Sequence, residues 1–182
     1  MADLRAVIGE LRSDGRFLSS VTHWETIPPR SGTYAPLPES LDARLREVLE
    51  RRGIGRLYSH QAQSFDFVSA GKNVVVVTPT ASGKTLCYNL PILNSLLDDA
   101  EGRALYLFPT KALSQDQQSE LGEIVIGAEV GIHVATYDGD TPQSVRVAAR
   151  DNGRIIITNP DMLHSGILPN HPKWIKFFSS LR

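Results

Sequence analysis

The chain of 182 residues is long enough for one compact domain with an extension and too short for two full domains. Its composition, 41% hydrophobic and 21% charged with 14 Gly and 11 Pro, excludes a wholly disordered or fibrous protein and predicts a folded core. The 19 Lys and Arg nearly balance the 20 Asp and Glu, so the net charge of −1 provides no overall basic field that would attract a nucleic acid.

The first 56 residues differ in composition from the rest and predict an arm followed by a lead-in helix. Residues 27–38 are rich in proline, which disfavours helices and central strands and favours an extended chain. Residues 39–53 predict an amphipathic helix, because four apolar residues recur at helical spacing and a glycine follows at the C-cap position: Leu41, Leu45, Val48, Leu49 and Gly53. We therefore expect two parts, residues 1–56 and residues 57–182.

Four short apolar runs follow and predict the strands of a parallel sheet. They cover residues 73–77, 104–108, 132–136 and 154–158, and their starts are 31, 28 and 22 residues apart. Apolar residues at successive positions are typical of strands buried on both faces, and these intervals leave room for a helix after each strand. The fold class expected for residues 57–182 is therefore α/β, with a mainly parallel, doubly wound sheet flanked by helices.

The sequence TPTASGKT follows the first of these runs directly and leads into a helix with leucines on one face. A loop between a strand and a helix binds phosphate through its backbone N–H groups and the helix N-terminus, and Gly83 permits the close approach. In such a loop Lys84 reaches the β- and γ-phosphate oxygens and the Thr85 hydroxyl ligates Mg²⁺. The strict pattern begins with Gly where this chain has Thr78, so a coincidental turn is the alternative. The predicted nucleotide-binding residues are Thr78, Pro79, Thr80, Ala81, Ser82, Gly83, Lys84 and Thr85, with Lys84 and Thr85 also predicted to act in catalysis.

Three further strings flank this loop: LYSHQ at residues 57–61, FPTKALSQDQ at 108–117 and ITNPDMLH at 157–164. Together with the loop, their order and spacing resemble the first RecA-like domain of superfamily 2 helicases of the DEAD/DEAH-box type. The resemblance implies a RecA-like P-loop fold and a site for ATP with Mg²⁺. It also implies that Gln61, 17 residues before Thr78, recognises adenine, whereas a surface glutamine is the alternative. Tyr58 either stacks on the base or packs the lead-in helix.

The same resemblance implies a nucleic-acid interface at the carboxyl ends of the later strands. Its predicted residues are Pro109, Thr110, Lys111, Gly139, Thr158, Asn159 and Pro160. Each has a plain structural alternative, since Pro-Thr and Asn-Pro also simply begin helices. Asp140 is a poor ligand for phosphate, and residues 98–151 hold ten acidic against four basic residues, so weak and salt-dependent binding of DNA is expected. A groove around the basic residues Arg44, Arg46, Arg51 and Arg52 would make that binding tighter.

The lead-in and the loop resemble most closely a branch of helicases that carry a C-terminal cysteine-rich, metal-binding domain, over residues 24–182. That resemblance implies an ATP-driven DNA translocase moving 3′ to 5′ in DNA repair, with single-stranded or partly duplex DNA as its partner and RNA less expected. The family's acidic motif, its second RecA-like domain and the cysteine cluster are not found in the 182 residues. We therefore expect an enzyme of this family whose fragment here binds nucleotide without hydrolysis. A stand-alone, non-hydrolysing nucleotide- or nucleic-acid-binding module is the alternative.

Three features of the sequence indicate the compartment of the protein and whether it contacts a membrane. The longest apolar run, residues 86–97, is interrupted by polar residues and is shorter than the roughly 20 residues that span a membrane. The N-terminus has no apolar region of the signal-peptide type. Cys87 is the single cysteine of the sequence and has no partner for a disulfide, as suits a reducing compartment. A cytoplasmic protein without membrane contact is expected.

Overall fold

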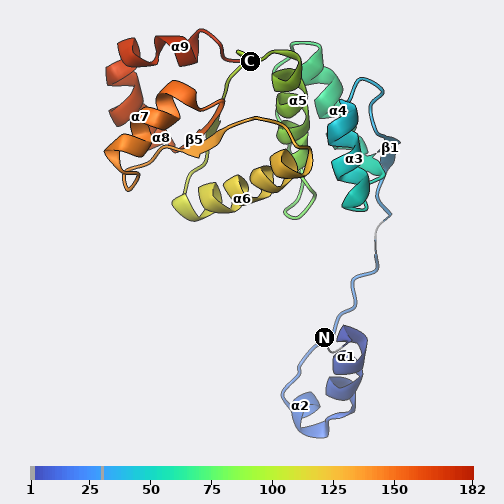
Figure 1. Cartoon of the computed structure of the whole chain (residues 1–182). Helices are drawn as coiled ribbons and strands as arrows, with labels where there is room; N and C mark the ends of the chain where they lie inside the picture. Colours follow the sequence, from blue (N-terminus) through green and yellow to red (C-terminus); the bar gives the residue numbers. More distant parts are fainter. Residues whose placement is uncertain (1–2, 30) are drawn as a thin grey trace. The chain divides into compact units, whose positions relative to one another are not determined.

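The structure, a computed structural model, describes residues 3–29 and 31–182 and divides into two compact units, Met1–Gly32 and Thr33–Arg182 (Figure 1). The smaller unit contains α1 (Leu4–Ser13) and α2 (Gly15–Ser19), neither of which has a buried residue. Trp24 packs edge-on against Phe17, with ring centroids 6.4 Å apart, and the Arg12 guanidinium lies 4.8 Å from the Trp24 ring. Arg30, inside the predicted proline-rich stretch, lies outside the described residues.

The larger unit begins with two strands and two helices: β1 (Tyr34–Pro36), α3 (Ala43–Arg51), β2 (Arg56–Tyr58) and α4 (Ser59–Ser69). β1 and β2 pair antiparallel, with Tyr34 opposite Tyr58. The predicted lead-in helix is confirmed as α3, whose Asp42 N-cap accepts a hydrogen bond from the Arg44 N–H and whose apolar face is buried in the core. The two units therefore divide at residue 32, whereas the sequence placed the domain start near residue 57.

The rest of the larger unit alternates helices and parallel strands. In chain order the elements are α5 (Thr85–Asp98), β3 (Ala104–Leu107), α6 (Lys111–Gly127), β4 (Val134–Thr136), α7 (Gln143–Asn152), β5 (Ile155–Thr158), α8 (Pro160–Met162), η1 (Leu163–Ile167), η2 (Leu168–Trp174) and α9 (Ile175–Phe178). The strands pair in the order β3-β5-β4, and both pairings are parallel. Three of the four predicted strands are thus confirmed, and the α/β class with them.

Helices cover both faces of this sheet, as the burial of the central strand demonstrates. Ile155 and Ile157 of β5 belong to the core formed with α3, α5 and α6, whereas Ile156 between them belongs to a second core with Trp174 and Phe177. Successive side chains of a strand point to opposite faces, so the two cores lie on opposite sides of the sheet. Figure 1 shows α6 on one side of β5 and α7, α8 and α9 on the other. The predicted doubly wound arrangement follows directly from three consecutive isoleucines.

The predicted strand at residues 73–77 is wrong for this structure. The segment has no regular secondary structure, and the side chains of Val75 and Val77 are each 89% exposed. A strand requires a neighbour that accepts and donates its backbone hydrogen bonds. The outer edge of β3 is met instead by the segment around Leu181, which forms a parallel bridge with Arg103, and the described residues provide no strand beside residues 73–77.

No helix in the described part of the chain is both long enough and apolar enough to cross a membrane.

Candidate functional site

The predicted phosphate loop, Thr78–Thr85, leads into α5 with two residues in the left-handed region of backbone space. Ala81 has φ of 60° and Gly83 has φ of 74°, which turns the chain sharply just before the helix begins. The Lys84 ammonium group folds back across the loop and donates to the carbonyl oxygens of Thr78 (2.9 Å) and Pro79 (2.7 Å). The hydroxyl groups of Thr78 and Ser82 share a further hydrogen bond of 2.6 Å. The loop is therefore closed on itself around the ammonium group of Lys84.

Two neighbouring side chains of α4 hold this loop from outside. His60 Nε2 donates to the carbonyl oxygen of Ser82 (3.0 Å), and Gln61 Nε2 donates to that of Gly83 (2.8 Å). The other end of the Gln61 amide accepts from the Tyr58 N–H at 2.8 Å, and the side chain is buried. A Cβ atom on Gly83 would lie 2.7 Å from Gln61 Nε2, so the contact requires glycine there. Gln61 thus connects the start of α4 to the phosphate loop, while its predicted contact with adenine stays a prediction.

Aromatic side chains form a stack beside these contacts. Tyr34 and Tyr58 stack with their ring centroids 4.9 Å apart, and His60 lies on Tyr58 at 5.6 Å. The guanidinium of Arg56 lies over the Tyr34 ring at 5.3 Å. Both tyrosines remain substantially exposed. The stack therefore presents a flat aromatic surface next to the phosphate loop, which is the kind of surface on which a purine base packs.

The N-terminus of α5 lies near the carboxyl end of β3. Tyr88, in the first turn of α5, has its ring centroid 6.4 Å from that of Phe108, which directly follows β3. Its hydroxyl donates to Gln117 of α6 at 2.5 Å, and burial raises the pKa of this phenol. The phosphate loop is therefore placed at the end of the sheet where ligands bind in open α/β folds.

The donors of this loop fit a nucleotide phosphate. In the described part of the chain no protein acceptor is found for the backbone N–H groups of Gly83, Lys84 and Thr85, which stand at the N-terminus of α5. ATP would be held there by these N–H groups and by Lys84, whose ammonium group would exchange carbonyl oxygens for phosphate oxygens. Among the described residues no cluster of three or more His, Cys, Asp or Glu could hold a metal ion. A single hydroxyl, that of Thr85, suits a Mg²⁺ ion that arrives on the nucleotide, because Mg²⁺ keeps waters and phosphate oxygens as its other ligands.

The three predicted nucleic-acid segments lie together at the same end of the sheet. Thr110 is the N-cap of α6 and accepts from the Leu113 N–H (3.3 Å), and Asn159 is the N-cap of α8 and accepts from the Met162 N–H (2.8 Å). Pro109, Pro160 and Gly139 are exposed. Thr158 is 1% exposed, and its hydroxyl donates to the Tyr137 carbonyl at 2.6 Å. Its side chain therefore links β5 to the residue that follows β4, and its carbonyl oxygen accepts from the Phe108 N–H at 2.9 Å. The prediction of Thr158 as a nucleic-acid contact is wrong for this structure, because the residue is buried by these contacts.

The loop after β4 carries the densest polar network at this end of the sheet. Asp138 accepts from the N–H groups of Asp140 (3.1 Å) and Thr141 (2.9 Å) and from the Thr141 hydroxyl (2.7 Å). Burial acts against ionisation of this carboxyl, but these hydrogen bonds outweigh it and lower its pKa. Arg146 of α7 donates to the Gly139 carbonyl at 2.7 Å. Across the sheet edge, Lys111 forms an ion pair with Asp140.

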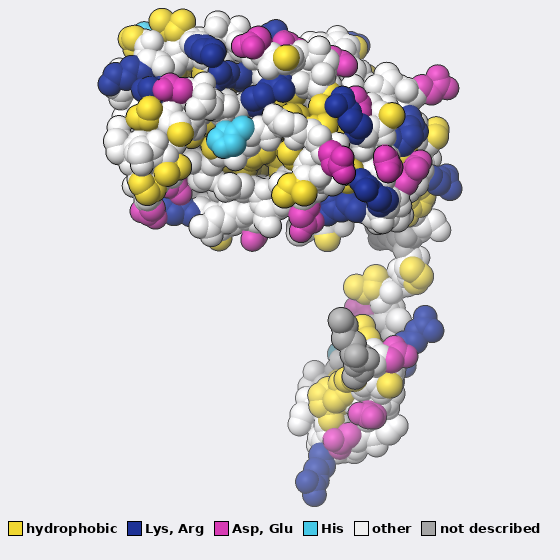
Figure 2. Space-filling view, in the orientation of Figure 1, with side chains coloured by type: hydrophobic (Ala, Val, Ile, Leu, Met, Phe, Trp, Pro, Cys, Tyr) yellow, Lys and Arg dark blue, Asp and Glu magenta, His cyan; other side chains and the backbone are white. Residues whose placement is uncertain are grey.

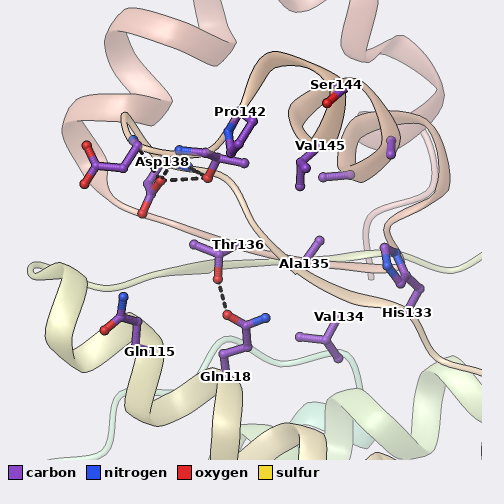
Figure 3. A pocket seen from close by; sticks show the side chains of 14 residues that line it. Gln115, Gln118, His133, Val134, Ala135, Thr136, Asp138, Pro142, Ser144 and Val145 are labelled. Atoms are coloured by element: carbon purple, nitrogen blue, oxygen red, sulfur yellow. Dashed lines mark hydrogen bonds between the residues drawn. The ribbon is translucent and has the colours of Figure 1, made fainter.

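A cavity of about 600 Å³ lies beside β4, between α6 and α7, and the same loop closes one end of it (Figure 3). Gln115 and Gln118 face it from α6, His133 and Thr136 from the segment of β4, and Ser144 and Val145 from α7. Gln118 accepts a hydrogen bond from the Thr136 hydroxyl. The phosphate loop does not line this cavity. It is thus separate from the predicted nucleotide site and adjacent to the predicted nucleic-acid loops.

Two basic residues of the lead-in, Arg44 and Arg51, line a pocket of about 300 Å³ together with Glu47 and Glu129. Arg44 pairs with Asp42 at 2.8 Å, and Arg52 pairs with Glu123 at 3.2 Å. Arg46 donates to the Pro38 carbonyl at 2.6 Å, and Arg51 donates to the Gly127 carbonyl. On the face of the larger unit shown in Figure 2, basic and acidic side chains are interspersed. The hollow in this described segment is therefore of mixed charge and is not the basic groove considered from the sequence.

Several contacts of the site have no obvious signal in the sequence. His60 directly precedes Gln61, whereas Tyr34 lies in the lead-in, and no spacing rule connects either residue to the phosphate loop. Arg146 is one of two arginines on the amphipathic helix α7, and nothing in the sequence distinguishes it from Arg150. The thiol of Cys87 is buried, and burial raises its pKa. A hydrogen bond between residues 22 positions apart, such as that from His60 to Ser82, depends on the packing of α4 against α5.

Comparisons with known proteins agree with this geometry. The DEAD/DEAH box helicase family profile matches residues 58–182. The chain is 53% identical over 173 residues to the ATP-dependent helicase YprA of Bacillus subtilis, covering 95% of this chain and 23% of that protein. It is 40% identical over 178 residues to the ATP-dependent helicase HRQ1 of Saccharomyces cerevisiae, covering 97% of this chain and 16% of that protein.

Solved structures give the same answer for the fold. The chain is similar to the DUF1998 helicase MrfA bound to DNA, with a TM-score of 0.86 and 50% identity over 100% of this chain and 25% of that one. The complex of MrfA with DNA and AMPPNP gives a TM-score of 0.87, at 50% identity, over 99% of this chain and 25% of that one. The chain thus spans about a quarter or less of the length of these relatives. It belongs to the DEAD/DEAH box helicase family.

Proposed function

We propose that this chain forms the ATP-binding first domain of an ATP-dependent DNA helicase. The observation that carries the proposal is the phosphate loop closed around Lys84 and held by His60 and Gln61, with an aromatic surface beside it. The relatives are named ATP-dependent helicases, and the MrfA complexes contain DNA and AMPPNP. The likeness to these proteins supports ATP rather than another nucleotide as the ligand.

DNA is the proposed nucleic-acid partner, bound across the loops that follow β3, β4 and β5. The hydrogen bonds between these loops, and the helix N-termini of α6 and α8, place exposed backbone groups and Lys111 along one edge. Helix N-termini and a lysine are typical ligands of backbone phosphates, which fix the position of a strand without reading its sequence. Movement in the 3′ to 5′ direction and a role in DNA repair belong to the same proposal, by analogy with the branch that the sequence resembles.

Within this proposal the residues have distinct tasks. Lys84 would leave the carbonyl oxygens of Thr78 and Pro79 and neutralise the β- and γ-phosphate oxygens. The stack of Tyr34, Tyr58 and His60 would face the base. Gln61 would sit between the two, because its amide already reaches Gly83 on the phosphate side. A shift of the phosphate loop on nucleotide binding would then be transmitted through Gln61 to the start of α4.

Titration calorimetry with ATP and Mg²⁺ tests the nucleotide half of the proposal. Lys84→Ala should weaken binding by roughly 10- to 100-fold, the effect of losing a charge-assisted hydrogen bond. Lys72→Ala is the matched control, because Lys72 is an exposed lysine whose ammonium group lies over the Phe67 ring at 5.4 Å, outside the loop. Equal affinities of the wild type and of Lys84→Ala would remove the phosphate-loop assignment.

The nucleic-acid half is tested separately by fluorescence anisotropy with labelled oligonucleotides of the same sequence in DNA and RNA. Micromolar or weaker binding that falls steeply with salt is expected for DNA, since the protein contacts to phosphate are few. Binding of RNA alone would replace the DNA assignment and leave the ATP assignment untouched.

A further inference from the structure

The loops that follow β3 and β4 are joined by an ion pair at the edge where nucleic acid is proposed to bind. Lys111 begins α6 and Asp140 lies in the loop after β4, 29 residues further along the chain. Both side chains are open to solvent, at 51% exposed for Lys111 and 77% for Asp140. The hydrogen bond that Lys111 donates to Asp140, together with the charges of Asp140 and Asp138, raises the pKa of Lys111. The one lysine of this edge is therefore matched by a carboxylate of the same protein.

The loop after β4 does not need this ion pair to keep its shape. The Asp138 carboxylate accepts hydrogen bonds from the backbone of Asp140 and Thr141, and Arg146 fixes the Gly139 carbonyl. The Arg146 guanidinium is in turn placed 5.7 Å from the Tyr137 ring. These contacts involve the backbone of Asp140, and among the described residues its carboxylate pairs only with Lys111. The carboxylate can therefore be exchanged for another anion without unfolding the loop.

We propose that Asp140 is an internal competitor for Lys111, whose carboxylate occupies the ammonium group until a backbone phosphate of the nucleic acid displaces it. The proposal rests on the proposed nucleic-acid function of this edge and adds the residue that limits its affinity. Without nucleic acid the ammonium group of Lys111 is paired with the Asp140 carboxylate. With nucleic acid Lys111 turns from Asp140 to a phosphate, and the loop after β4 remains held by Asp138 and Arg146.

The balance of forces makes this exchange feasible. Ion pairs between exposed side chains are weak, because water solvates both partners well and because two mobile side chains must be ordered. A phosphate of a nucleic acid competes with an added advantage, since each cation that binds the backbone releases condensed counterions. Asp140 thus lowers the affinity of the edge for nucleic acid without abolishing it. The acidic surroundings of Lys111 then act as a filter that rejects isolated anions and admits a polyanion.

A double-mutant cycle on the 182-residue chain tests the proposal, with anisotropy of a labelled single-stranded oligothymidine as the readout. Asp140→Asn should tighten binding by roughly two- to fivefold, the range in which an exposed ion pair contributes. Lys111→Ala should weaken binding and reduce the slope of log affinity against log salt by about 0.7. In the Lys111→Ala background, Asp140→Asn should lose its effect, because the cation for which it competes is gone.

Glu123→Gln is the matched control, since Glu123 is 66% exposed, pairs with Arg52 at 3.2 Å and lies on the same helix as Lys111. It removes the same charge, so any gain that it produces measures the general effect of net charge. Thermal unfolding should be equal for the wild type and Asp140→Asn, given the other contacts of the loop.

Each outcome decides between alternatives. A gain in Asp140→Asn that exceeds the control and vanishes with Lys111→Ala supports the competitor. Weaker binding by Asp140→Asn would overturn it and make Asp140 a residue that positions Lys111 for phosphate. An equal gain in Asp140→Asn and Glu123→Gln would also overturn it. If neither the wild type nor any variant binds, the proposed nucleic-acid function fails as well, whereas binding by Asp140→Asn alone would support the competitor in its strongest form.

Discussion

Replacing Gln61 with alanine removes two hydrogen bonds that connect different parts of the site. The amide accepts from the Tyr58 N–H and donates to the Gly83 carbonyl, both at 2.8 Å, from a side chain that is 4% exposed. Each bond is worth about 0.5 to 1.5 kcal/mol, and a partner left buried without a replacement costs at least as much. The loss of stability should therefore be about 2 kcal/mol, which for a chain of this size corresponds to roughly 4 to 8 °C in Tm.

The same variant separates two roles of Gln61 when ATP and GTP are both titrated. If the side chain only holds the phosphate loop, Gln61→Ala lowers the affinity for ATP and for GTP by the same factor. If it also reads adenine, as the sequence predicts, the wild type prefers ATP and the variant loses that preference. Gln61→Glu sharpens the test, because a carboxylate still accepts from Tyr58 and cannot donate to Gly83.

Gln63→Ala is the control for this pair, since Gln63 is an exposed glutamine of the same helix. It should change neither the Tm nor the affinity for either nucleotide. Unchanged stability and unchanged affinities in Gln61→Ala would refute the reasoning that this side chain anchors the phosphate loop.

Three further predictions follow from the described contacts. Leu45→Ala, at a fully buried position of α3, should destabilise the larger unit by about 2 to 5 kcal/mol in urea unfolding, and a loss below 1 kcal/mol would show that α3 is not part of the core. Thr110→Ala removes the N-cap of α6 and should cost about 1 kcal/mol, whereas Thr110→Ser should restore most of it. The lowered pKa of Asp138 gives stability that is complete above the unfolded-state pKa of about 3.9 and is lost as the pH falls toward the folded-state value, so Asp138→Asn should flatten the decline of urea stability as the pH falls below about 4.

Local patterns in the sequence were sufficient to predict the three strands of the parallel sheet and the helices α3 and α5. The runs at 104–108 and 155–157 are apolar at every position because β3 and β5 are covered on both faces, and this is the condition under which such a run identifies a parallel strand. The lead-in helix was equally clear, since its apolar stripe faces the core and its polar face remains in water. In each case the apolar residues of one segment pack against one buried surface, so the sequence pattern of that segment alone predicts its structure.

Pairwise contacts between distant loops could not be predicted in the same way. The ion pair of Lys111 with Asp140, the hydrogen bond of His60 to Ser82 and the return of Lys84 to Thr78 depend on how loops meet after the helices have packed. Residue type gives the chemistry of each group but not its partner. The sequence predicted Lys111 as a ligand for phosphate, and the structure adds that a carboxylate of the same protein stands against it.

The segment at residues 73–77 shows that an apolar run forms a strand only where a neighbouring strand can pair with it. Its apolar run predicts a buried strand, yet pairing requires a neighbour, and Val75 and Val77 stand exposed where the described residues provide none. The phosphate loop that follows is nevertheless ordered by contacts from other elements, since His60 and Gln61 come from α4, and Thr85 opens α5. These two helices pack closely against each other through the core. The geometry of the loop is therefore set by the α4 and α5 pair, so binding of nucleotide by the 182-residue chain is a fair test of the site even where the preceding strand is unpaired.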